Sequence, residues 1–139
     1  MTVLDLEMAQ KVLDSQPFSG LVGARITEFG GGAATLEIDG REELQQQNGF
    51  LHGGVLAYAA DNALTFAAGT TLGPAVLTGG FSIQYLRPAT GTALVARAAV
   101  VHTGRRQAVA RCDLFAVGED GEQTLCAVAQ GTVLSAATS

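Results

Sequence analysis

Apolar and other residues alternate along much of the chain, with the two-residue period of half-buried β-strands. The stretches with this pattern are residues 21–29, 33–38, 75–87, 92–103, 107–117 and 124–134. Glycine-bearing turns separate the last three stretches, and a Gly30-Gly31-Gly32 turn separates the first two. Successive turns at this spacing predict antiparallel strands joined by short hairpins.

The pattern changes in the middle of the chain. Residues 53–71 are rich in alanine and contain no proline, which favours a helix. This segment is apolar on nearly every face, so we expect a helix surrounded by protein. Gly73-Pro74 ends it. A second, shorter amphipathic helix is predicted over residues 3–14, ahead of Pro17. One long helix among antiparallel strands indicates the α+β class.

The long helix has two unusual features. It opens with Gly53-Gly54, where the first backbone N–H groups have no partner inside the helix. It also carries Asp61 in its apolar body, where an ionised group is costly unless it is paired or used. Free N–H groups at a helix start favour developing negative charge, as on a polarised carbonyl oxygen. Asp61 is either a salt-bridged or solvated residue, or a nucleophile or general base.

The spacing of these two features indicates more than one chain. Asp61 follows Gly53 by eight residues, which corresponds to about 12 Å along a helix axis. A single chain therefore does not easily bring Gly53 and Asp61 to one reacting atom. Two copies with their long helices side by side in opposite directions would do so, which predicts a two-fold dimer with shared sites.

The loop before the helix carries four consecutive amides, Gln45 to Asn48. They belong either to a solvated loop or to a pocket, where one or two would bind water or a carbonyl. His52, directly before Gly53, is expected to fix the helix start by hydrogen bonding. Phe50 is a core aromatic or a pocket wall. Gly104-Arg105-Arg106 forms a basic turn that is either solvated or bound to phosphates, and Arg87 is a candidate to join it.

Bulk properties narrow the class of protein. The 139 residues predict one domain, with a helix and linker over residues 1–19 and a core over 20–135. The net charge of −5 argues against a nucleic-acid binder, and no uncharged apolar run of membrane-spanning length occurs. Cys112 and Cys126 are expected to be buried thiols, which indicates a reducing, cytoplasmic setting. No residues stand at metal-ligand spacing beside the two histidines, so we expect neither metal nor cofactor.

Three segments together resemble the PaaI-type hotdog-fold acyl-CoA thioesterases. They are Asn48-Gly49-Phe50-Leu51-His52-Gly53-Gly54 followed by Asp61, Tyr85-Leu86-Arg87-Pro88-Ala89, and Val101-His102-Thr103-Gly104-Arg105-Arg106. The resemblance covers roughly residues 20–135. It implies the hotdog fold, in which a curved antiparallel sheet wraps a long central helix. It also implies a homodimer and favours association of dimers into a homotetramer.

The resemblance also implies roles for individual residues. The Gly53 N–H would polarise the thioester carbonyl, beside Gly54 and His52. Asp61 of the other subunit would attack the carbonyl carbon or activate water. Thr78 stands where many members carry a hydroxyl that helps to place the water.

The resemblance is less specific about binding groups. Many members carry an asparagine six residues before the histidine, whereas this chain has Gln46 there and Asn48 four before. The amide that holds the water or the acyl carbonyl is therefore open between these two. Nucleotide contact is favoured near Gly104.

The leading expectation is hydrolysis of an acyl-CoA thioester to a free acid and coenzyme A, with an aryl or medium-chain acyl group. A hotdog hydratase or dehydratase is one alternative, in which a histidine and an acid transfer protons. A non-catalytic module that binds or senses acyl-CoA is another, although binding alone does not require Asp61.

Overall fold

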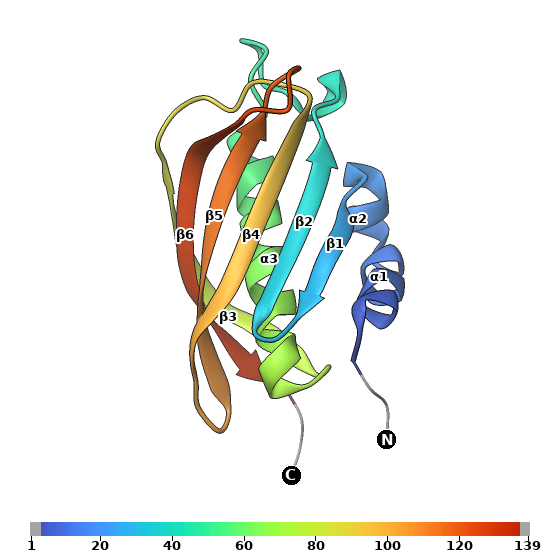
Figure 1. Ribbon diagram of the computed structural model, residues 1–139, viewed down its shortest axis with the longest axis vertical. Coiled ribbons are helices and arrows are strands. Elements are labelled where there is room, and N and C mark those ends of the chain that lie inside the picture. Colours follow the sequence, from blue (N-terminus) through green and yellow to red (C-terminus); the bar gives the residue numbers. More distant parts are fainter. Residues whose placement is uncertain (1–3, 137–139) are drawn as a thin grey trace.

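The computed structural model describes residues 4–136, in which six antiparallel strands curve around one long helix (Figure 1). The strands are β1 (Arg25–Gly30), β2 (Ala33–Asp39), β3 (Val76–Tyr85), β4 (Ala93–Thr103), β5 (Gln107–Val117) and β6 (Gln123–Ser135). The helices are α1 (Leu6–Asp14), α2 (Pro17–Val22) and α3 (Gly53–Leu72), with a single 3₁₀ turn η1 (Glu42–Leu44). The predicted fold, a central helix wrapped by a curved sheet, is confirmed.

The sheet order is β1-β2-β4-β5-β6-β3, so β3 leaves the chain order and forms an edge. The hairpins β1–β2, β4–β5 and β5–β6 follow the glycine-bearing turns that the sequence marks. Gly30, Gly31 and Gly32 all have positive φ, as the first of these turns requires. The sequence pattern gives the strands but does not say that β3 crosses to the far edge.

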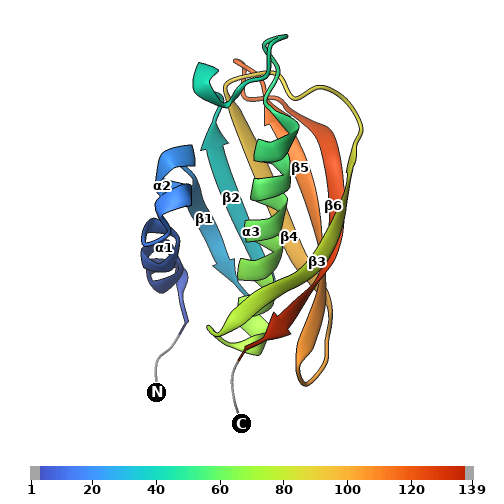
Figure 2. The same ribbon diagram turned by 180° about the vertical axis from the view of Figure 1, so that it is seen from behind.

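Helix α3 lies on the concave face of the sheet, with α1 and α2 to one side and β3 to the other (Figure 2). Its sheet-facing residues are mostly alanines without exposed surface, among them Ala60, Ala63 and Ala67. Small side chains allow the backbone of the helix to approach the sheet closely.

The side of α3 that faces away from the sheet is more exposed than the sequence predicts. The sequence predicts a helix enclosed on every face, yet Gly54 is exposed and several residues on its side are only partly buried. These partly buried residues are Tyr58, Asp61, Asn62 and Thr65. The sheet of a single chain covers one side of the helix. On the other side Tyr58 contacts α2, where its hydroxyl donates to Ser19 Oγ, whereas Gly54 and Asp61 remain accessible.

Strand β3 bends where the sequence places its paired glycines. Its register with β6 shifts between Thr78 and Gly80. A Cβ atom on Gly79 would lie 3.2 Å from the Thr132 carbonyl oxygen and 3.3 Å from Leu134 Cγ. The bulge therefore depends on the absence of a side chain, and it turns Thr78 toward α3.

The N-terminal region departs from the predicted linker. Pro17 does not end a helical segment; it occupies the first turn of α2, where its missing N–H is harmless. Residues 21 and 22 consequently belong to α2, and β1 starts only at Arg25.

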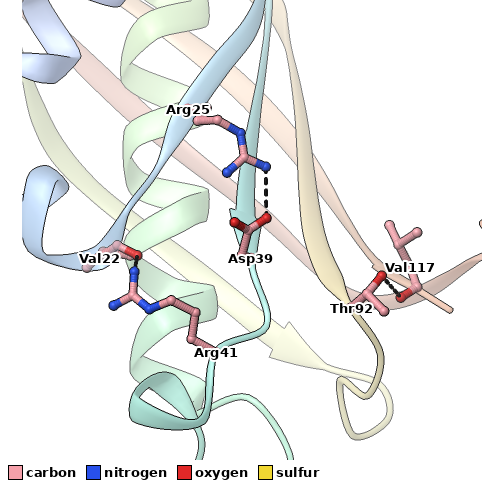
Figure 3. A network of polar contacts seen from close by, with 6 residues as sticks. All are labelled: Val22, Arg25, Asp39, Arg41, Thr92 and Val117. Carbon is pink, nitrogen blue, oxygen red and sulfur yellow. Dashed lines mark hydrogen bonds and ion pairs between the residues drawn. The ribbon is translucent and has the colours of Figure 1, made fainter. Parts of the chain in front are cut away.

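A clamp joins α2 to the segment after β2 (Figure 3). Arg41 donates to the Val22 and Leu21 carbonyl oxygens, both at 3.0 Å, and so satisfies the carboxyl end of α2. Arg25 pairs with Asp39 at 3.1 Å between β1 and β2. These contacts fix the chain just before it enters η1 and the loop that leads to α3.

Candidate active site

The start of α3 is fixed by its own neighbouring residue. His52 has extended backbone, and its Nδ1 accepts a hydrogen bond from the Gly54 N–H at 2.8 Å. The His52 carbonyl oxygen accepts from the Val55 N–H at 2.9 Å. The supporting role predicted for His52 is thus visible in the geometry. Within residues 4–136, the Gly53 N–H is left without an acceptor.

Tyr85 holds the same helix start from β3. Its hydroxyl donates to the Gly53 carbonyl oxygen at 2.9 Å. That oxygen and the Gly54 N–H belong to one peptide group, so Tyr85 and His52 hold both ends of it. A Cβ atom on Gly53 would lie 3.4 Å from the tyrosine ring. The unpaired Gly53 amide therefore stands on a backbone that is fixed before any ligand arrives.

Four of the predicted binding and catalytic residues meet at one cavity. Gly53, Gln46, Phe50 and Arg87 line a space of about 340 Å³ that Tyr85 also borders. The Leu51 N–H donates to the Ala89 carbonyl oxygen at 3.0 Å, which ties the loop before α3 to the segment after β3. This tie explains why two segments far apart in the sequence contribute to one cavity.

The two candidate amides have different surroundings. The Gln46 side chain borders the cavity, and its Oε1 accepts from the Asn48 N–H. Asn48 is exposed and does not line this cavity. Of the two amides, Gln46 is the one that lines the same cavity as Gly53.

Asp61 lies in a second cluster, at the middle of α3. Its Oδ1 accepts a hydrogen bond from the Thr78 hydroxyl of β3 at 2.5 Å. The Thr65 hydroxyl lies 2.8 Å from the Thr78 hydroxyl and 3.4 Å from Asp61 Oδ1. The sequence singled out Asp61 and Thr78 but missed Thr65. Thr65 follows Asp61 by four residues, a spacing that places two side chains on one helix face.

The hydroxyls constrain how the carboxylate is presented. Because the Thr78 hydroxyl donates to Oδ1, that oxygen acts as an acceptor and is held in place. The Thr65 hydroxyl lies 2.8 Å from both the Thr78 hydroxyl and the Asp61 carbonyl oxygen, and it supports Thr78. Asp61 Oδ2 makes no hydrogen bond among the residues that the structure describes, and the residue is only partly buried. The free oxygen is therefore the one that can meet a substrate or a water molecule.

The two parts of the site stay apart within one chain. Gly53 and Asp61 are separated by about 12 Å along α3. They also meet β3 at different places, Gly53 at Tyr85 and Asp61 at Thr78. A single chain therefore offers the donor and the carboxylate at two separate positions.

The basic residues do not form one group. Arg105 and Arg106 are exposed in the β4–β5 turn with Gly104, at the end of the molecule opposite the start of α3 (Figure 1). Arg87 lies beside Gly53. The expectation that Arg87 joins the turn is wrong for a single chain, because β4 runs the length of the sheet between them.

Other reactive groups are shielded. Burial raises the pKa of Cys112 to about 12, and burial also raises the pKa of Cys126. Both thiols are free and buried, as the sequence predicts.

Residues 4–136 contain no group of three histidine, cysteine or acidic side chains arranged to hold a metal. None of the helices in this part of the chain is long and apolar enough to span a bilayer.

Comparison with known proteins places this geometry in a family. The sequence profile of the Thioesterase superfamily matches residues 48–122, which include Gly53, Asp61, Thr78 and Tyr85. The chain belongs to the thioesterase superfamily. The enzyme class predicted from the sequence, a thioester hydrolase, is thereby confirmed.

Solved structures of other proteins match over most of the chain. A thioesterase family protein from Silicibacter pomeroyi is 33% identical with a TM-score of 0.84, over 91% of this chain and 93% of that one. The phenylacetic acid degradation protein PaaI of Thermus thermophilus, in a mutant form, is 30% identical with a TM-score of 0.74, over 86% and 99%. E. coli PaaI shares the fold at 20% identity, with a TM-score of 0.78 over 94% and 92%. The predicted PaaI-type hotdog fold is confirmed.

Proposed function

We propose that this thioesterase hydrolyses acyl-CoA thioesters to a free acid and coenzyme A. The observation that carries the proposal is the Gly53 amide, which is held rigidly at a helix start and has no acceptor in the described chain. A donor of this kind stabilises the charge that develops on a carbonyl oxygen under attack, by a factor of about 10²–10³ in rate. Asp61 supplies the second reactive group.

Two routes are compatible with the geometry. In the first, Asp61 Oδ2 attacks the carbonyl carbon, the C–S bond breaks, the thiolate leaves, and water then hydrolyses the acyl-aspartyl anhydride. In the second, Asp61 takes a proton from a water molecule that attacks the same carbon, and the proton passes to the departing sulfur. In both, Thr78 keeps Asp61 Oδ1 in place, and Thr65 contacts Thr78.

The active form that we propose is a two-fold homodimer. Gly54 at the start of α3 is exposed, Asp61 is only partly buried, and β3 beside α3 forms a free edge of the sheet. Two α3 helices running in opposite directions would bring the Gly53 amide of one chain toward Asp61 of the other. Association of two such dimers into a homotetramer is a further prediction.

The same arrangement suggests where the nucleotide binds. When Gly53 of one chain faces Asp61 of the other, the far end of the second α3 extends about 16 Å beyond Gly53. The turn of Gly104, Arg105 and Arg106 lies near that far end, since Thr103 contacts Thr71. Arginine forms charge-assisted, bidentate hydrogen bonds with phosphates. We assign this turn to the phosphates of coenzyme A, with Arg87 and Gln46 beside the thioester end.

A panel of acyl-CoAs with a thiol reagent tests the proposal. We expect free thiol to appear in proportion to enzyme, because hydrolysis releases coenzyme A. A change in enoyl absorbance without thiol would indicate a hydratase. Saturable binding without either signal would indicate a binding module. Either of these two results would overturn the proposed function.

A further inference from the structure

The turn between β4 and β5 is anchored to the last turn of α3. The Thr103 hydroxyl of β4 donates to the Thr71 hydroxyl of α3 at 3.0 Å. The Thr71 hydroxyl in turn donates to the Ala68 carbonyl oxygen at 3.2 Å. Thr71 therefore links the end of β4 to the main chain of the helix, and loss of its hydroxyl would break both bonds.

A small apolar cluster supports the same end of the hairpin. Ala68 of α3, Ala108 of β5 and Val133 of β6 are fully buried and form it, and Leu72 packs against them. This cluster is distinct from the large core that surrounds the middle of α3. The position of the β4–β5 turn is therefore set by local contacts with the end of α3.

The main chain of the turn is closed by its own hydrogen bonds. The Gly104 N–H donates to the Gln107 carbonyl oxygen at 2.7 Å, and the Ser135 N–H of β6 donates to the Arg106 carbonyl oxygen at 2.8 Å. In the described part of the chain, the guanidinium groups of Arg105 and Arg106 take part in no hydrogen bond or ion pair. The turn thus carries two free guanidinium groups on a fixed backbone.

A fixed backbone favours binding, because groups that must first be ordered lower the affinity. We propose that Thr71 is a positioning residue for the coenzyme A nucleotide, and that it acts by holding the β4–β5 turn through Thr103. This inference rests on the proposed function and on the assignment of the turn to the phosphates. In the proposed dimer, the turn serves the active site whose Gly53 belongs to the other chain.

The distance from the reactive groups separates binding from chemistry. Thr71 follows Asp61 by ten residues, which corresponds to about 15 Å along α3. Its hydroxyl makes no contact with the Asp61 cluster. Loss of the anchor should therefore weaken nucleotide binding and leave the chemical step unchanged.

Paired substitutions isolate the anchor. Thr71→Val and Thr103→Val keep the shape of each side chain but remove one or the other hydroxyl, whereas Thr71→Ser keeps the hydroxyl. Thr92→Val is the matched control at the other end of β4, because Thr92 is also exposed and its hydroxyl donates to the Val117 carbonyl oxygen at 3.4 Å. Thermal melts check that all variants fold.

The measurement is KM and kcat for two substrates with the same acyl group. One is the acyl-CoA that reacts fastest in the panel, and the other is its N-acetylcysteamine thioester, which lacks the nucleotide. Thr71→Val should raise KM for the acyl-CoA by about 2–10-fold, the contribution of a neutral hydrogen bond. Its kcat should not change, and neither should its KM for the short thioester, because lost ground-state binding raises KM alone.

The other variants complete the comparison. Thr103→Val should raise KM for the acyl-CoA in the same way, and the double valine variant should match Thr71→Val, since their shared hydrogen bond is lost only once. Thr71→Ser and Thr92→Val should match the wild type on both substrates.

The possible results separate the two proposals. An increase in KM that is confined to the acyl-CoA, shared by both valine variants and recovered by Thr71→Ser supports the positioning role. Thiol release with an unchanged KM for the acyl-CoA in either valine variant overturns that role and leaves the proposed function standing. A fall in kcat, or an equal increase in KM on both substrates, overturns it as well, since either would indicate a general structural role. Absence of thiol release from every acyl-CoA overturns the proposed function and the inference that rests on it.

Discussion

The two reactive regions of α3 use different chemical groups: main-chain groups at the start of the helix and side chains at its middle. At the start of the helix, main-chain groups carry the proposed chemistry, and the glycine leaves the Gly53 amide accessible while His52 and Tyr85 hold it. At the middle of the helix, side chains carry the chemistry, and the Thr78 hydroxyl, which Thr65 contacts, orients Asp61. The first region therefore tolerates substitutions that keep the backbone, whereas the second depends on particular functional groups.

The largest effect is expected from Asp61→Asn. The amide keeps the shape of the side chain but is neither a good nucleophile nor a base, so kcat should fall by about 10²–10⁴-fold. Sedimentation and coenzyme A binding should stay close to those of the wild type. Near-normal hydrolysis of several acyl-CoAs by this variant would remove Asp61 from the mechanism.

Gly53→Pro tests the main-chain donor with little other change. Proline has no N–H and is accepted at the first position of a helix. His52 already has the extended backbone, with φ −62° and ψ 135°, that a residue before proline requires. We expect kcat to fall by about 10²–10³-fold.

Gly53→Ala is the matched control for the proline variant. It adds a Cβ atom at nearly the same place, 3.4 Å from the Tyr85 ring, but keeps the N–H. Its kcat should stay within about tenfold of the wild type. Equal losses in the alanine and proline variants would show that space, and not the amide hydrogen, matters at this position.

Thr78→Val should have a smaller effect than either Asp61→Asn or Gly53→Pro. It removes the hydroxyl that donates to Asp61 Oδ1. A hydrogen bond to a charged group contributes about 1.5–3 kcal/mol, so a loss of about 10–100-fold in kcat is expected. Thr78→Ser, which keeps the hydroxyl, should recover most of the activity. Failure of serine to do better than valine would argue against the orienting role.

The smallest effect is expected from Tyr85→Phe. The ring remains against Gly53, but the hydrogen bond to the Gly53 carbonyl oxygen is lost. A neutral hydrogen bond contributes about 0.5–1.5 kcal/mol, which corresponds to roughly 2–10-fold in kcat. Because Tyr85 acts through the backbone, kcat should fall more than KM rises. An effect confined to KM would instead indicate that Tyr85 binds substrate directly.

The sequence predicts much of the fold because its signals are local. The bounds of β2 and β5 follow alternation and turn residues closely. The N-terminal region is less predictable, since Pro17 is equally compatible with the end of one helix and the start of another. The placement of β3 at the far edge depends on contacts between distant segments, which a local pattern does not contain.

The candidate site also combines residues that local sequence reveals with residues that only contacts between distant segments reveal. Gly53 and Asp61 stand out in the sequence because each is unusual in its own segment. Thr65 is an ordinary helix residue until β3 brings Thr78 to it. Tyr85 lies in a recognisable segment, but its bond to Gly53 appears only in three dimensions. The separation of Arg87 from Arg105 and Arg106 likewise follows from the length of β4.

The most direct test of the shared site is complementation between two inactive variants. Asp61→Asn and Gly53→Pro chains are unfolded together, refolded as a one-to-one mixture, and assayed for thiol release. If each site combines Gly53 of one chain with Asp61 of the other, a mixed dimer has one intact site, and about a quarter of wild-type activity should return. Activity no higher than the mean of the two separate variants would contradict the shared site, provided that mass spectrometry detects the mixed dimer.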